Sequence, residues 1–132
     1  MKSLLPPGWP RPKGYSNGIS ARGRLIVTAG VIGWDADEQL VSTDLADQFR
    51  QVLLNTLAIL AEDGAGPEHV VRMTWYVVDR DDYVANLPRI GAVYRELMGR
   101  NYPTMAVVQV AGLVEPGALI EIETTAVVLE GD

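Results

Sequence analysis

The chain has 132 residues, of which 48% are hydrophobic and 21% are charged, a balance typical of one globular domain. It contains no cysteine, which excludes disulfides, thiolate nucleophiles and cysteine-bound zinc. The formal net charge of −6 disfavours a nucleic-acid partner. No apolar stretch is long enough for a membrane span or a signal peptide, so we expect a cytoplasmic protein.

The first 13 residues are rich in proline and contain Trp9. Proline removes a backbone donor and fixes φ, so this stretch cannot form a helix interior. We expect an extended arm over residues 1–13, which Trp9 could pin to the body or to a neighbour. A single folded domain is expected over residues 14–132.

Two strands are predicted over residues 15–22 and 24–32, with a tight turn at Gly23. Gly30 and Gly33 interrupt the second strand. A glycine inside a strand often marks a bulge or a backbone that another group approaches closely. We therefore expect one of these features near Gly30.

The clearest helix covers residues 44–62, where apolar side chains recur at three- and four-residue steps along one broad face. Thr43 or Asp44 can cap its start. Gln48 and Asn55 lie seven residues apart on this helix, and we expect both to anchor it to neighbouring backbone.

A further strand is predicted over residues 69–78 and a second helix over residues 83–99, with Pro88 near the start of its regular part. Residues 79–82 form a charged turn in this prediction. The lone histidine, His69, stands at the strand's entrance and is expected to be an exposed edge residue. A chain with one histidine and no cysteine offers no histidine pair for a metal.

The last fifth of the chain holds two β-rich runs around a loop with Pro116 and Gly117. In the second run Glu121 and Glu123 alternate with isoleucines, and a carboxylate in such a strand needs water or a partner. Spacing alone favours a solvated sheet face, with one wall of a polar cleft as the alternative.

The predicted order is β-β-α-β-α-β-β. Two amphipathic helices need one sheet face to cover them, which predicts a two-layer α+β domain. The other sheet face is left open and partly polar, suited to subunit contact. We expect it to carry the following residues: Thr74, Tyr76, Gln109, Glu121, Glu123.

Residues 103–110, which read Pro-Thr-Met-Ala-Val-Val-Gln-Val, and residues 120–126, which read Ile-Glu-Ile-Glu-Thr-Thr-Ala, resemble the closing signature of the RidA family (YjgF/YER057c/UK114). Weaker resemblances precede them at residues 14–16 and 28–30. The family includes enamine and imine deaminases. The resemblance implies a chorismate-mutase-like fold and a homotrimer with ligand clefts between subunits. Where the deaminases carry an arginine that pairs with the substrate carboxylate, this chain has Met105.

The resemblance also implies roles for individual residues. Glu121 occupies the position of the glutamate that places the attacking water, Tyr15 that of a cleft tyrosine, and Gly30 that of a backbone contact. Gly91 stands where the deaminases have an asparagine before the aromatic residue of the second helix. Arg89 is a weak candidate for a cleft cation, with Arg72 as a further option.

Three functions remain open at this point. The first is a hydrolase or deaminase acting on an imine, enamine or related small molecule, with Glu121 as acid and base and Met105 forming an apolar wall. The second is a non-catalytic trimer that binds a metabolite in its clefts. The third is a structural or chaperone-like protein. No cofactor or metal is implied by any of them.

Overall fold

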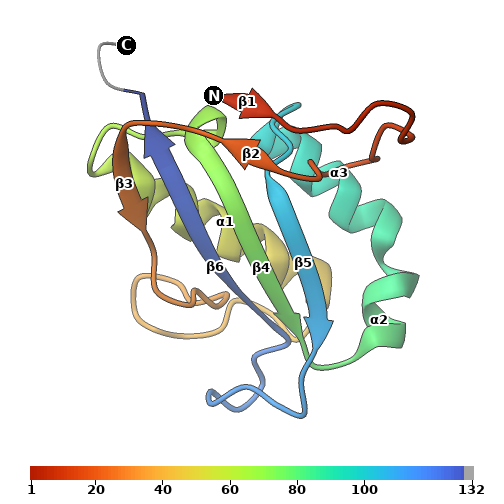
Figure 1. Ribbon diagram of the computed structural model, residues 1–132. Helices are drawn as coiled ribbons and strands as arrows, with labels where there is room; N and C mark the ends of the chain where they lie inside the picture. Colours follow the sequence, from red (N-terminus) through yellow and green to blue (C-terminus); the bar gives the residue numbers. More distant parts are fainter. Residues whose placement is uncertain (130–132) are drawn as a thin grey trace.

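The computed structural model describes residues 1–129 and shows a four-stranded sheet with helices on one face (Figure 1). The strands are β3 (Arg24–Val27), β6 (Ile120–Val128), β4 (Val70–Val77) and β5 (Thr104–Gln109), side by side in that order. Only β4 and β5 run parallel; the other two pairings are antiparallel. The two β-rich runs near the C-terminus, β5 and β6, are therefore not neighbours, because β4 lies between them.

Helices α1 (Leu45–Ala61) and α3 (Leu87–Met98) cover one face of this sheet. Alternate residues of β6 and β4 point into the layer between sheet and helices, where Phe49, Met73, Ile120 and Ile122 have no exposed surface. The predicted two-layer α+β architecture is confirmed, while the element order differs by an added strand at the start and a divided second helix. Within residues 1–129 no helix is both long enough and apolar enough to cross a membrane.

The anchoring roles expected for Gln48 and Asn55 are confirmed. Gln48 is fully buried; its side-chain amide donates to the carbonyls of Ser42 (2.8 Å) and Gly117 (2.9 Å), and its oxygen accepts from the N–H of Leu119 (2.8 Å). Asn55 donates to the carbonyl of Trp34 (2.7 Å). The two amides thus tie the segment between β3 and α1 and the loop before β6 to α1.

The predicted strand over residues 15–22 is mostly wrong. Only β2 (Ile19–Ser20) is a strand, and it pairs with β1 (Lys2–Ser3) in a separate two-stranded sheet. The arm is therefore tied down at its start, whereas Trp9 is 59% exposed and does not pin it to the body. The strand predicted over residues 24–32 ends early at Val27, and the chain rejoins the sheet only at Val31, opposite Ile122.

The second helix is broken in two. The charged turn of the prediction is the start of α2 (Arg80–Ala85), because the side chain of Asp79 accepts hydrogen bonds from the N–H groups of Asp81 and Asp82. The chain leaves helical geometry at Asn86 (φ −99°, ψ 6°) and restarts as α3. Pro88 lies in the first turn of α3, where its missing N–H is not needed for a helical hydrogen bond, whereas it could not continue α2 because no N–H is left there to bond four residues back.

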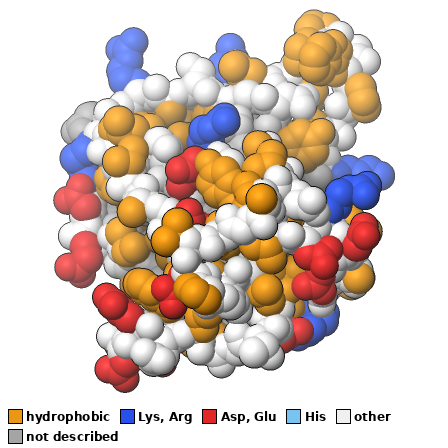
Figure 2. Space-filling model, turned by 90° about the horizontal axis from the view of Figure 1, so that it is seen from below, with side chains coloured by type: hydrophobic (Ala, Val, Ile, Leu, Met, Phe, Trp, Pro, Cys, Tyr) orange, Lys and Arg blue, Asp and Glu red, His pale blue; other side chains and the backbone are white. Residues whose placement is uncertain are grey.

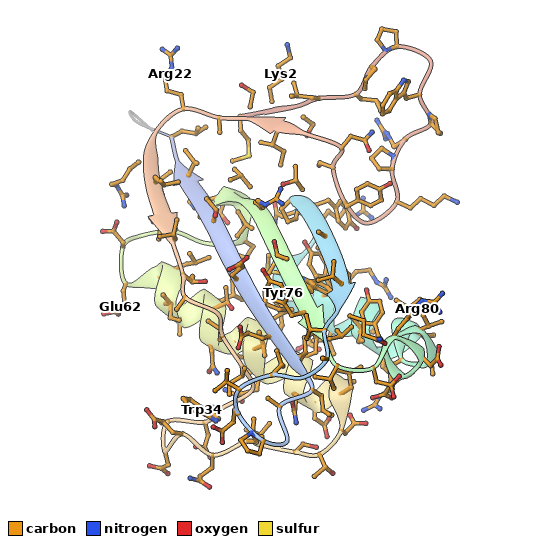
Figure 3. All side chains as sticks on the ribbon, turned by 60° about the horizontal axis from the view of Figure 1, so that its bottom comes forward. Lys2, Arg22, Trp34, Glu62, Tyr76 and Arg80 are labelled. Atoms are coloured by element: carbon orange, nitrogen blue, oxygen red, sulfur yellow. The ribbon has the colours of Figure 1, made fainter. Side chains whose placement is uncertain are left out.

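Two further expectations are corrected. His69 is half-buried at the end of the 3-10 helix η1 (Pro67–His69), where its Nδ1 accepts from the N–H of Gly66 (3.0 Å). Gln109 is not on the open sheet face with Tyr76: its side chain accepts from the N–H of Arg80 (2.6 Å), at the start of α2. The remaining expected residues of the open face are on it, and Figure 3 shows Tyr76 near its centre.

Candidate functional site

Two cavities lie toward opposite edges of the sheet. The first, of about 470 Å³, is bounded by β5, α3 and the end of the arm, and we call it the aromatic cavity after five of its lining residues. These are Tyr15, Trp75, Tyr83, Tyr94 and Tyr102. The second, of about 780 Å³, is bounded by residues 29–36, one face of α1 and the loop before β6. We call it the acidic cavity because Asp35, Glu115 and Glu121 line it.

The views of the structure agree with this separation. In Figure 3, Trp34, which lines the acidic cavity, lies on the β3 side of the molecule, and Arg80, at the start of α2, lies beyond β5. Figure 2 views the molecule from the end that carries the loops of the acidic cavity. Hydrophobic side chains are spread across that end, with acidic side chains among and around them.

Tyr15 is held beside β5 by its neighbour Ser16. The N–H of Ser16 donates to the carbonyl of Pro103 (3.0 Å), and its hydroxyl donates to the carbonyl of Tyr102. This connection replaces the predicted strand, and it brings Tyr15 and Met105 into the same cavity. Tyr15 is 44% exposed and Met105 is half-buried, so both side chains are accessible from the opening.

The aromatic wall is a packed cluster. Tyr94 stacks on Tyr102 with ring centroids 6.1 Å apart and planes 11° from parallel, and Trp75 contacts both Tyr94 (6.2 Å) and Tyr83 (6.4 Å). Burial raises the pKa of Tyr94 and of Tyr83 above the ordinary tyrosine value. Both phenols are therefore neutral at physiological pH and add no negative charge to the wall.

Arg95 contributes a cation to this wall. Gly91 and Arg95 are four residues apart on α3 and so share a helix face. The guanidinium lies over Gly91: a Cβ placed on that glycine would be 3.3 Å from Nη1 of Arg95. No carboxylate among residues 1–129 forms an ion pair with Arg95, and no aspartate or glutamate of this range lines the cavity.

In the acidic cavity Gly30 and Glu121 are in direct contact. Gly30 lies where the chain detours between β3 and the bridge at Val31, and a Cβ on it would be only 2.5 Å from Oε2 of Glu121. The expectation that something approaches the backbone closely at Gly30 is confirmed, and the approaching group is this carboxylate. Any larger residue would displace it.

Glu121 differs from Glu123 in its partners, although both point to the same side of β6. Glu123 accepts a hydrogen bond from the hydroxyl of Tyr76 (2.6 Å), which raises the pKa of that phenol. The carboxylate of Glu121 has no hydrogen-bond or ion-pair partner among the residues that the structure describes. A half-buried carboxylate with open acceptor positions is suited to hold a water molecule.

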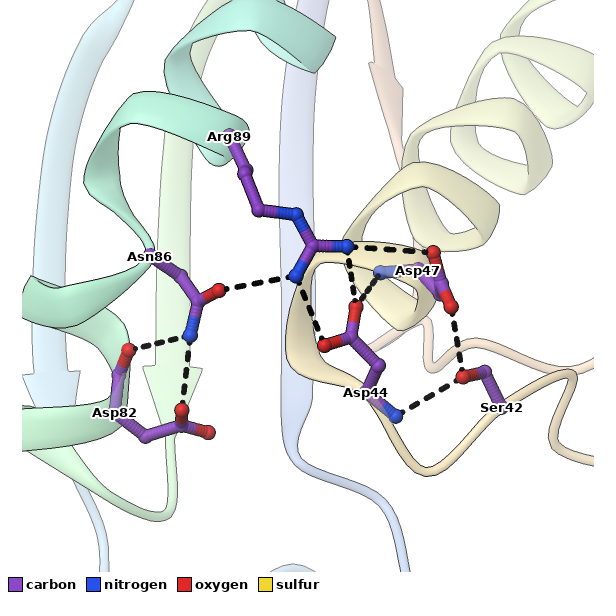
Figure 4. A network of polar contacts seen from close by, with 6 residues as sticks. All are labelled: Ser42, Asp44, Asp47, Asp82, Asn86 and Arg89. Atoms are coloured by element: carbon purple, nitrogen blue, oxygen red, sulfur yellow. Dashed lines mark hydrogen bonds and ion pairs between the residues drawn. The ribbon is translucent and has the colours of Figure 1, made fainter.

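Arg89 lies in neither cavity. Its guanidinium forms two hydrogen bonds to the carboxylate of Asp44, at 3.0 and 2.8 Å, and a third to Asn86 (3.3 Å), as Figure 4 shows. Asp44 in turn caps α1 by accepting from the N–H of Asp47 (3.0 Å). The bonds from Arg89 hold the pKa of Asp44 below its ordinary value. In this geometry Arg89 joins the first turns of α1 and α3.

A single chain therefore divides the predicted site residues. Tyr15 and Met105 share the aromatic cavity, Gly30 and Glu121 share the acidic cavity, and Arg89 is apart from both. Sequence reasoning missed Arg95, although the four-residue spacing from Gly91 pointed to it. No three histidine, aspartate or glutamate side chains of residues 1–129 cluster as a metal site would require.

The fold is an α+β domain of the chorismate-mutase-like type, with predicted site residues beside both edges of its sheet. The chain belongs to the RidA family: the family model described as Endoribonuclease L-PSP matches residues 10–128. It is 37% identical over 119 residues to a RutC family protein of Pyrococcus horikoshii, covering 89% of this chain and 90% of that one.

Two other relatives bear on function. The chain is 34% identical over 105 residues to the human 2-iminobutanoate/2-iminopropanoate deaminase, covering 79% of this chain and 73% of the human protein. A crystal structure of YyfB from Yersinia pestis, described as a Rid family protein of unknown function, superposes with a TM-score of 0.84 at 33% identity. It covers 96% of this chain and 98% of that one. The family thus contains deaminases of small imines.

The contact between Gly30 and Glu121 leads to a prediction. Gly30→Ala adds a methyl group where Oε2 of Glu121 now lies, so the flexible carboxylate must move aside. We expect at least a tenfold loss of any turnover (about 1.4 kcal/mol in the barrier), with unfolding free energy changed by less than about 1 kcal/mol. Steady-state rates and urea unfolding check this. Full activity in the alanine variant would show that the position of this carboxylate is unimportant.

Proposed function

We propose that the protein is a homotrimer that hydrolyses an imine or enamine in clefts between its subunits. The observation that carries this proposal is the division of the site residues between two cavities at opposite sheet edges. A contact that joins one edge of a subunit to the other edge of the next is heterologous, and such contacts form a ring when the rotation between subunits closes. Each cleft would then combine the aromatic cavity of one subunit with the acidic cavity of its neighbour.

The open sheet face supports the same assembly. Leu25 and Val27 are each 65% exposed on it, and Val108 is 42% exposed, beside the polar side chains of β4 and β6. Exposed apolar side chains gathered on one face mark a site of protein contact. In a trimer these faces would line the central interior.

In the proposed reaction Glu121 positions a water molecule next to the imine carbon. The substrate reacts as the N-protonated imine: the carboxylate accepts a proton from the water as the water oxygen bonds to the carbon, and the C=N electron pair moves to nitrogen, which gives a neutral carbinolamine. Glu121 returns that proton to the amine nitrogen. The C–N bond then breaks as the C=O bond forms, the hydroxyl proton passes back to the carboxylate or to water, and a carbonyl compound and ammonia are released. No cofactor is needed for this hydrolysis.

Met105 supports a substrate range different from that of the deaminases. A thioether cannot pair with a carboxylate as a guanidinium does. We expect 2-iminopropanoate and 2-iminobutanoate, generated in situ by oxidising the parent amino acids, to be hydrolysed little faster than in buffer. Ammonia release measures this, with the human deaminase as the positive control. Turnover matching that enzyme would assign the carboxylate contact to another cation.

A non-catalytic metabolite-binding trimer is the second candidate, and the apolar side chain of Met105 in the cleft is the observation that favours it. The two candidates separate in one assay. Hydrolysis of any imine in a panel of aliphatic and aromatic examples, lost in Glu121→Gln, supports the enzyme. Ligand binding without acceleration of any member supports the binding protein.

A further inference from the structure

We propose that the aromatic cavity binds a flat aromatic carboxylate, with the ring against the tyrosine and tryptophan wall and the carboxylate on Arg95. This inference rests on the proposed function, because it names the ligand class of the same cleft. It moves the carboxylate contact away from position 105 to a residue on α3.

The charge of the cavity is opposite to that of the protein. The chain has a net charge of −6, yet the only charged residues of range 1–129 that line this cavity are the cations Lys13 and Arg95. Arg95 has no carboxylate partner in that range. The arginines that do have one are Arg24, Arg50, Arg80 and Arg89. A cation left without a partner beside a concave surface is complementary to an anionic ligand.

The position of Arg95 fixes where that anion would lie. Residue 91 has no side chain, and Nη1 of Arg95 lies over it beside the cavity, while Arg95 as a whole is exposed. It presents a planar fork of donors, which matches a carboxylate in two hydrogen bonds.

The other lining residues favour a ligand that contains an aromatic ring. Five aromatic rings and Met105 line a cavity of about 470 Å³, a size that suits a ring-containing molecule better than a three-carbon acid. Aromatic rings pack on one another edge-to-face or offset, and methionine sulfur also contacts rings favourably. Because the buried tyrosines stay neutral, they do not repel the carboxylate.

Titration calorimetry with three probes tests this. Phenylacetate carries the ring and the charge, acetate only the charge, and phenylacetamide only the ring. We expect phenylacetate to bind at least about tenfold more tightly than either of the others. Equal affinities of phenylacetate and acetate would overturn the proposed role of the aromatic wall. Equal affinities of phenylacetate and phenylacetamide would overturn the proposed contact with the carboxylate. If phenylacetate did not bind, the whole proposal would be overturned.

Variants locate the contact. Arg95→Gln should weaken phenylacetate binding about tenfold while leaving phenylacetamide binding unchanged, which a merely misfolded protein would not do. Arg100→Gln, an exposed arginine outside the cavity, is the matched control and should change neither. Unchanged phenylacetate binding in Arg95→Gln would overturn the assignment.

The outcome can be separated from that of the proposed function. Glu121→Gln should leave phenylacetate binding intact, because the ring and the carboxylate are held by the other cavity. Binding as expected without any effect of Glu121→Gln on turnover would refute the hydrolase and leave the ligand class standing. Loss of turnover in Glu121→Gln, in a protein that does not bind phenylacetate, would support the hydrolase and refute the ligand class.

Discussion

Replacing Glu121 by glutamine should reduce imine hydrolysis by at least about 100-fold, the range that general acid–base groups contribute. Glutamine keeps the shape of the side chain but cannot accept and return a proton. The carboxylate has no partner among residues 1–129, so its neutralisation breaks no ion pair in the subunit. Thermal unfolding should therefore change by no more than an ordinary surface substitution does, about 0.5 kcal/mol.

Glu123→Gln is the matched control, because Glu123 lies two residues further along the same side of β6. Its glutamine can still accept the hydrogen bond from Tyr76, so turnover should stay within a factor of about two of wild type. Equal losses in both variants would indicate a general effect of charge on the sheet face. A stability loss in Glu121→Gln as large as the activity loss would instead place Glu121 in a network across the subunit interface.

Gln48→Leu should lower the free energy of unfolding by about 3 kcal/mol, because three backbone groups lose a buried partner and each costs about 1 kcal/mol or more. These groups are the carbonyls of Ser42 and Gly117 and the N–H of Leu119. Leucine fills a similar volume, so the effect reports the lost hydrogen bonds more than a cavity. Urea unfolding at one fixed protein concentration measures it, since association shifts apparent stability.

Gln51→Leu provides the comparison on the same helix. Gln51 is half-buried and its side chain donates only to the side chain of Asn55 (2.8 Å), so its loss should cost less than about 1 kcal/mol. If Gln48→Leu cost no more than Gln51→Leu, the anchoring of the two loops by Gln48 would be refuted.

The sequence allowed prediction of the elements whose own pattern decides their structure. The apolar face of α1 and the alternation in β6 follow from burial of one side, and both are present. The strand expected over residues 15–22 failed because its backbone partners are Lys2 and Ser3 and the start of β5, contacts that no local pattern specifies. The division into α2 and α3 follows from two local signals that the prediction did not use: Asp79 caps the start of α2, and Pro88 lies in the first turn of α3.

The sequence proposed residues of the candidate site one by one, but it did not show how they are arranged. Resemblance pointed to Tyr15, Gly30, Met105 and Glu121, yet a pattern along the chain does not show that two of them lie at each edge of the sheet. Arg95 was missed because its spacing from Gly91 places the two on one helix face but does not show that the guanidinium lies against the glycine beside the cavity. That contact is a property of packing between two residues and not of either residue alone.

Sedimentation velocity at micromolar concentration tests the central claim, that the site is built between subunits, most directly. We predict one species with about three times the mass of the chain, because the contact between opposite edges is heterologous and three subunits are the closed ring that the family resemblance implies. A stable monomer at that concentration would leave Tyr15 and Met105 permanently separated from Gly30 and Glu121, and would contradict the proposed cleft.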